Sequence, residues 1–153
     1  MSTRDSSWLR EALATRDIEQ VKPNMAAAGE RINDARRHVR SARRLADDDR
    51  TLAMSACHDA IRKSITAHMA FAGFRARGGE GAHRIVLAYA RDQLADAIAP
   101  ADLDEADDIR RDRGLAEYGD FASRQLTPSH IQTAADVAER IVNAVASALA
   151  SRG

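Results

Sequence analysis

Three arginines within four residues, Arg110, Arg111 and Arg113, are the strongest candidates for chemistry in this sequence. Arg113 follows Ile109 by four residues and precedes Ala116 by three, so a helix would place it beside an apolar stripe. Taking a guanidinium group out of water costs free energy unless a carboxylate, a bound anion or a second chain pairs with it. The position of Arg113 therefore predicts either an anion-binding site or an ion pair.

Asp59 is the carboxylate that we expect to pair with Arg113. It lies among apolar residues of a central segment, and His58, Arg62 and Lys63 are close to it in the sequence. Charge pairs of this kind occur in functional sites and also as salt bridges between helices. The sequence leaves both interpretations of the pair open.

A glycine-rich segment, residues 77–84, offers a second group of phosphate contacts through Arg77 and Arg84, together with Arg75 just before it. It lacks the lysine and the hydroxyl residue of a P-loop, and no predicted strand precedes it. A turn explains its glycines better than a nucleotide-binding loop does.

The sequence predicts no metal site and no cofactor. No two of the five histidines have the i, i+4 spacing that would place two ligands on one helical face. The acidic run of residues 102–108 resembles a calcium loop, but Asp107 stands where that loop needs glycine. These acids are better explained as the start of a helix, where they complement the helix dipole.

The hydrophobic pattern predicts that helices position all of these residues, and no segment has the alternation of a strand. The fold class is therefore predicted to be all-α. Ser6 and Ser7 can cap a short first helix, Gly73 can end the third, and Thr127 can cap the sixth. The other predicted helices cover residues 26–46, 51–72, 82–99, 102–119 and 127–150.

The composition predicts one domain of ordinary size, because 44% of the 153 residues are hydrophobic. We expect a helix and linker over residues 1–25 and a helical bundle over residues 26–153. Cys57 is the only cysteine, which favours a reducing compartment, and no segment is apolar enough to span a membrane. We therefore expect a cytoplasmic protein. A net charge of zero argues against a protein that coats polyanions in general.

Three segments together resemble a bacterial branch of the HEPN family. They are residues 56–67, the glycine-rich residues 78–83, and residues 110–113 followed by Glu117 and Tyr118. The resemblance covers about residues 26–150. It implies an up-and-down bundle of four to five core helices, to which this chain adds the short N-terminal helix. It also implies a homodimer, because HEPN domains commonly dimerise, and many are metal-independent endoribonucleases of toxin–antitoxin or defence systems.

The signature of that family is an arginine, four to six further residues and a histidine, which hold the scissile phosphate and move a proton. Arg113 matches the arginine, but Tyr118 stands in place of the histidine. A phenol with a pKa of about 10 is a poor general base at neutral pH. The resemblance thus implies a domain that binds RNA or a nucleotide-linked partner, with Arg113, Tyr118 and Asp59 at its centre. The basic residues expected to contact nucleic acid are Arg110, Arg111, Arg62, Lys63, Arg77, Arg84 and His83.

Two other functions stay open from the sequence. One is an endoribonuclease in which Arg113 works with a non-standard base, such as His58 or His83 brought near by folding. The other is a purely structural protein-interaction module. Some family members are paired with a nucleotidyltransferase, and there a tyrosine accepts AMP. The resemblance therefore also implies that Tyr118 can be an AMP acceptor and that the partner is a nucleotidyltransferase or an antitoxin.

Overall fold

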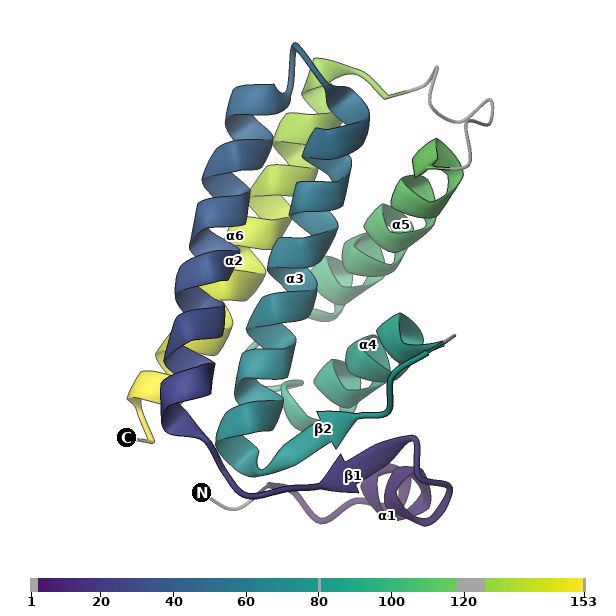
Figure 1. Ribbon diagram of the computed structural model, residues 1–153, viewed down its shortest axis with the longest axis vertical. Coiled ribbons are helices and arrows are strands. Elements are labelled where there is room, and N and C mark those ends of the chain that lie inside the picture. Colours follow the sequence, from purple (N-terminus) through teal and green to yellow (C-terminus); the bar gives the residue numbers. More distant parts are fainter. Residues whose placement is uncertain (1–2, 80, 118–125, 153) are drawn as a thin grey trace.

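The computed structural model describes residues 3–79, 81–117 and 126–152, without the side chains of residues 115–117. The described elements are mainly helices, which confirms the all-α prediction and the bundle architecture (Figure 1). In chain order they are α1 (Ser7–Ala14), β1 (Ile18–Gln20), α2 (Met25–Leu45), α3 (Arg50–Ala72), β2 (Phe74–Ala76), α4 (Ala82–Gln93), α5 (Pro100–Glu117) and α6 (Pro128–Ala150).

Helix α3 is the central element of the bundle, as its nearly continuous apolar surface predicts. It packs against α2, α4, α5 and α6, and α2 and α6 also contact each other (Figure 1). Ala53, Ala60 and Ala67 of α3 have no exposed surface, and such small residues let neighbouring helices approach closely. Of the candidate site residues of α3, His58 is buried between helices, and Asp59, Arg62 and Lys63 are half-buried.

The ends of the helices follow local rules of capping. The side chains of Ser6, Asn24, Asp49 and Thr127 each accept a hydrogen bond from a backbone N–H in the first turn of a helix. Gly73 ends α3 in the left-handed conformation, with φ +88°, and a Cβ there would lie 2.9 Å from a backbone oxygen. The predicted caps at Ser6, Gly73 and Thr127 are confirmed.

The expectation of no strands is wrong. Ile18–Gln20 and Phe74–Ala76 form a two-stranded antiparallel sheet in which Ile18 lies opposite Ala76. Each strand has three residues, too few for an alternating pattern to be visible in the sequence. The sheet connects the N-terminal segment to the chain that follows α3, and Leu9, Ala12 and Ile18 belong to the same hydrophobic core as the long helices.

Two predicted helix boundaries around Pro100 are also wrong. Helix α4 ends at Gln93 rather than near Ala99, and turns follow it in which Leu94 and Ile98 remain buried. Pro100 is the first residue of α5, where its missing N–H costs no hydrogen bond. Burial of Leu94 and Ile98 explains why the apolar pattern continued past the true end of α4. The predicted helix end at Gly119 lies outside the described residues.

None of the helices in the described part of the chain has the length and apolar character needed to cross a membrane.

Candidate functional site

Two histidines from different helices meet between α3 and α4. Nε2 of His58, in the middle of α3, lies 3.3 Å from Nδ1 of His83, in the first turn of α4. Their rings pack edge to face with a centroid separation of 4.8 Å. Gly81 precedes α4 in the left-handed conformation, with φ +85°, and this turn directs the start of α4 toward α3. The histidines are 25 residues apart in sequence, so tertiary packing creates the pair.

Both imidazoles are held in the neutral form. The pKa of His58 is lowered to about 4, first by burial and then by the charges of His83 and Arg113, while Asp59 opposes them. The pKa of His83 is lowered first by partial burial and then by the positive charges of Arg62 and Arg113. A neutral imidazole has one nitrogen that donates and one that accepts, so a proton on one ring determines the tautomer of the other.

Helices α3 and α5 supply the charges around this histidine pair. The positive charges of Arg62, Arg113 and Arg110 all lower the pKa of His83. Nη2 of Arg62 lies 3.7 Å from Oδ1 of Asp59, one turn earlier on α3, and Nη2 of Arg110 lies 3.0 Å from Oδ1 of Asp107. The fold thus brings Asp59 and Arg113 to one site, while a direct ion pair between them stays a prediction.

A pocket of about 550 Å³ opens beside the histidine pair. His83 and Arg62 line it together with Lys63, and Val86 and Phe74 supply apolar surface. Nε of Arg62 is buried and makes no hydrogen bond to the described residues. The pocket therefore offers cationic groups beside a surface that a flat ring can contact, and its size is in the usual range for small-molecule sites.

We call Arg62, Arg113, His58, His83 and Asp59 the histidine–arginine cluster. Of the other predicted contact residues, Lys63 lies beside the cluster. Lys63 pairs with Asp34 of α2, with Nζ 3.4 Å from Oδ2, and both side chains line the adjacent pocket.

The remaining predicted contact residues are not part of the cluster. Arg111 is 61% exposed and its ion pairs are with Asp107 and Asp108 of its own helix. Arg77 and Arg84 are exposed and line a separate hollow of about 310 Å³. Tyr118, and with it the predicted AMP acceptor, lies outside the described residues.

Two further arginines line the 550 Å³ pocket: Arg31, which the sequence did not suggest as a contact, and Arg75, which it suggested as a phosphate contact beside the glycine-rich loop. Arg31 of α2 donates from Nη1 to the carbonyl oxygen of Thr66 at 2.9 Å, and Arg75 of β2 pairs with Glu19 of β1 at 2.6 Å. Arg75 lies at the pocket because β2 pairs with β1, a strand pairing that the sequence did not predict. Arg31 carried no local signal, since it is one of several arginines on α2.

The arrangement can hold an oxyanion and transfer a proton. Guanidinium groups bind phosphate oxygens in geometries with two hydrogen bonds, and a neutral imidazole beside them can accept a proton at pH 7. Among the described residues no three histidine, cysteine or acidic side chains are grouped to hold a metal. Burial raises the pKa of the Cys57 thiol to about 12, so this cysteine is not a nucleophile at neutral pH.

Comparison with known proteins gives one result. A family model described as the HEPN domain matches residues 28–148, which is most of the chain. This match confirms the resemblance seen in the sequence. No curated protein and no solved structure gives a significant match to the chain.

Proposed function

The chain belongs to the HEPN domain family, and from that premise we propose that it binds single-stranded RNA, or the nucleotide of a partner, at the histidine–arginine cluster. Family membership supports a role that involves RNA or nucleotides in general. The observation that carries the finer proposal is the meeting of Arg62 and Arg113 around the neutral pair of His58 and His83.

Charge favours a phosphate at this place. The net charge of the whole chain is zero, so binding depends on a local excess of positive groups. Arg62, Arg113 and Arg110 all bring positive charge close enough to His83 to lower its pKa, and Asp59 is the carboxylate that opposes them. An RNA phosphate would contact these guanidinium groups, and the adjacent pocket would receive a neighbouring nucleoside.

The proposal places the protein in a bacterial toxin–antitoxin or defence setting. It acts there as a homodimer with an antitoxin or a nucleotidyltransferase as its partner, since HEPN domains often dimerise and bind RNA. Tyr118 is retained as the proposed AMP acceptor. The remaining proposed contacts are Arg110, Arg111 and Lys63 beside the cluster and, in a separate hollow, Arg77 and Arg84.

Fluorescence anisotropy with a labelled single-stranded RNA, measured over a series of salt concentrations, tests this proposal. For Arg62→Gln and Arg113→Gln we expect affinity to fall about tenfold, and each lost phosphate contact should reduce the slope of log K against log salt by about 0.7. Arg140→Gln is the matched control, because Arg140 is exposed and pairs with Asp102 away from the cluster. RNA binding that these variants leave unchanged, or no binding at low salt, would contradict the proposal.

One observation favours a second function, a metal-independent endoribonuclease. The family histidine is absent at position 118, yet folding brings His83 beside Arg62 and Arg113. When Nδ1–H of His83 donates to Nε2 of His58, the other nitrogen of His83 can accept a proton. His83 would then take the proton of a ribose 2′-hydroxyl as the 2′-oxygen attacks the phosphorus. The bond from phosphorus to the 5′-oxygen would break, and that oxygen would take up a proton.

A cleavage assay in the presence of EDTA separates the two functions. The endoribonuclease predicts cleavage that His83→Ala and Arg113→Ala both abolish, while His83→Ala retains RNA binding. Binding without any cleavage leaves the first function standing alone. Cleavage that persists in His83→Ala rules out His83 as the base.

A further inference from the structure

The pocket of about 550 Å³ beside the histidine–arginine cluster carries two acidic side chains, which binding of a phosphate does not explain. Ala27, Glu30, Arg31 and Asp34 of α2 line one side of it, at the spacing that places them on one helical face. Residues of α3, β2 and the start of α4 complete the lining. Because a carboxylate repels a phosphate, these acids point to contacts with another part of a nucleotide.

Glu30 is the acidic lining residue whose carboxylate is available to a ligand. Asp34 uses Oδ2 in its ion pair with Lys63, at 3.4 Å, and Oδ1 in its ion pair with Arg37. The side chain of Glu30 is exposed and makes no ion pair or hydrogen bond with a described residue. Both of its oxygens can therefore accept hydrogen bonds from a ligand.

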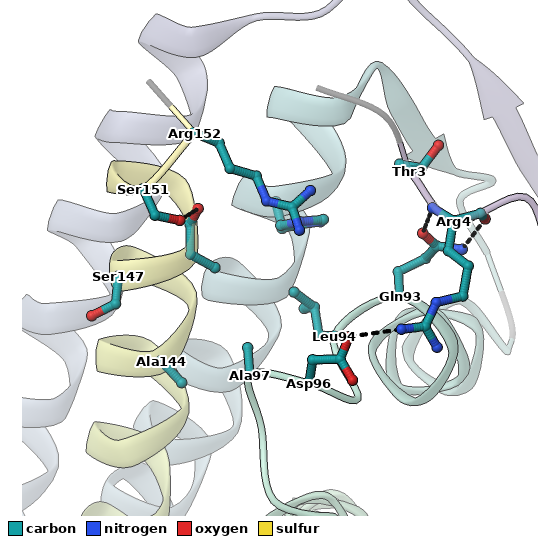
Figure 2. A pocket seen from close by; sticks show the side chains of 12 residues that line it. Thr3, Arg4, Gln93, Leu94, Asp96, Ala97, Ala144, Ser147, Ser151 and Arg152 are labelled. Carbon is teal, nitrogen blue, oxygen red and sulfur yellow. Dashed lines mark hydrogen bonds and ion pairs between the residues drawn. The ribbon is translucent and has the colours of Figure 1, made fainter.

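A second cavity, of about 600 Å³, contains a carboxylate that the fold already uses. Figure 2 shows this cavity between the end of α6 and the N-terminal segment, with Asp96 in its lining. Oδ2 of Asp96 lies 2.7 Å from Nη2 of Arg4, and the side-chain amide of Gln93 donates to the carbonyl oxygen of Arg4 at 2.8 Å. Asp96 thus holds the N-terminal segment in place, whereas Glu30 holds no other described segment.

Arg31, the residue after Glu30, brings hydrogen-bond donors to the 550 Å³ pocket. Its Nη1 donates to the carbonyl oxygen of Thr66 at 2.9 Å, which fixes the guanidinium against α3. Its Nε and Nη2 make no hydrogen bond to a described residue. Phe74 and Val86 add apolar surface. The pocket therefore offers a pair of acceptors, a pair of donors and a surface that a flat ring can contact.

We propose that this pocket recognises guanine, with the carboxylate of Glu30 accepting from N1–H and N2–H of the base and the guanidinium of Arg31 donating to O6 and N7. The inference rests on the proposed function, because the phosphate of the bound nucleotide would lie at the histidine–arginine cluster. The N9 atom of a base held in this way points away from α2 and toward α4, where His83 lines the pocket.

The other three bases do not match both side chains. Guanine has two adjacent N–H donors on one edge and the acceptors O6 and N7 on the next. Adenine and cytosine have a ring-nitrogen acceptor beside the amino group, and uracil has carbonyl oxygens on both sides of its N–H. Each of them would place an acceptor against the second oxygen of Glu30, which leaves that charge without a donor.

Two-dimensional NMR of the full chain, titrated with GMP, AMP, CMP and UMP, tests the base preference without RNA. We expect GMP to bind about tenfold more tightly than each of the other three, because contacts with two hydrogen bonds discriminate between bases by about this factor. Amide signals of Ala27, Ala76 and Gly78, which line the pocket, should shift to saturation. Equal affinity for the four nucleotides would overturn the proposal.

Glu30→Gln should reduce the preference for GMP over UMP to about twofold or less. UMP should bind this variant at least as well as it binds the wild type, because a charge that repels phosphate is lost. Glu11→Gln is the matched control, since Glu11 is exposed on α1 and does not line the pocket, and it should keep the preference. A preference that Glu30→Gln leaves unchanged would also overturn the proposal.

The outcomes separate the guanine pocket from RNA binding. If RNA affinity depends on Arg62 and Arg113 while the four nucleotides bind equally, the guanine pocket is wrong and the proposed function stands. If GMP is preferred through Glu30 while no RNA binds at low salt, the guanine pocket stands and RNA binding is wrong.

Discussion

His58 and His68 lie on the same helix, and the comparison between them separates burial from function. They are ten residues apart, about 15 Å along α3. Both are at most 4% exposed, and burial lowers the pKa of each to about 4. Their partners differ, since His58 contacts His83 near two arginines and His68 contacts the hydroxyl of Tyr89.

The difference shows that neighbours, and not burial, determine what a buried imidazole can do. At His58 a second imidazole lets a proton move between rings, and Arg62 and Arg113 can hold an oxyanion. At His68 the partner is the hydroxyl of Tyr89, whose oxygen lies 2.9 Å from Nδ1. The first arrangement suits proton transfer and RNA phosphate, and the second links α3 to α4 through a buried hydrogen bond.

Acidification should produce the largest effect, and it should act on both histidines. Their folded pKa values lie below the unfolded value of about 6.5, so the unfolded state binds more protons and stability falls as pH drops from 6.5 toward 4. Between pH 7 and pH 5 each should cost about 2 kcal/mol of unfolding free energy. Urea unfolding at the two pH values measures this loss, and equal stability at both would contradict it.

Removing the partner of each histidine should have unequal effects on stability. Tyr89→Phe leaves Nδ1 of buried His68 without its hydrogen-bond partner, which should cost about 1–3 kcal/mol. His83→Ala should cost about 1 kcal/mol or less, because His83 is half-buried and water can replace it. Chemical denaturation with an unchanged m-value checks the comparison. A larger loss in His83→Ala would reverse our assignment of the structural and functional sites.

The same His83→Ala variant should change the pKa of His58 without changing that of His68. Loss of the second ring removes a cause of the lowered pKa of His58 and admits water, so that pKa should rise, while the pKa of His68 should not change. Imidazole NMR signals followed against pH give both values. A shift of both pKa values would mean that the two sites are coupled.

Arg111→Gln should give the smallest effect. Its side chain is 61% exposed and pairs with Asp107 and Asp108, so stability should change by about 0.5 kcal/mol or less. RNA affinity should change less than in Arg113→Gln, because Arg111 does not affect the histidine pair. Anisotropy with the same RNA measures this, and an equal loss would move the binding surface to the outer face of α5.

Much of the fold follows from local sequence signals. Thr127 before Pro128 marks the start of α6, Gly73 marks the end of α3, and the apolar surface of α3 makes it central. The strands could not be predicted, because Ile18–Gln20 pairs with a segment more than 50 residues away and each strand is too short to show a pattern. Helix α4 was predicted too long because Leu94 and Ile98, which lie in the turns after the helix, are buried and continue its apolar pattern.

The site was predictable only in part. The position of Arg113 beside an apolar stripe predicted a site on the helix that is α5, and the run that contains Asp59 and Arg62 predicted that α3 contributes to it. The pair of His58 and His83 could not be predicted from the spacing of residues within one helix, because the packing of α4 on α3 creates it. Folding therefore supplies a histidine near Arg113 although the local motif has a tyrosine.

Imidazole NMR during titration with single-stranded RNA tests the central claim most directly. The account predicts that the ring nitrogen signals of His83 and His58 shift with saturating RNA, while those of His68 stay in place. In Arg113→Gln the same shifts should require about ten times more RNA. Shifts confined to His68, or RNA binding that leaves all three imidazoles unchanged, would contradict the assignment of the histidine–arginine cluster as the RNA site.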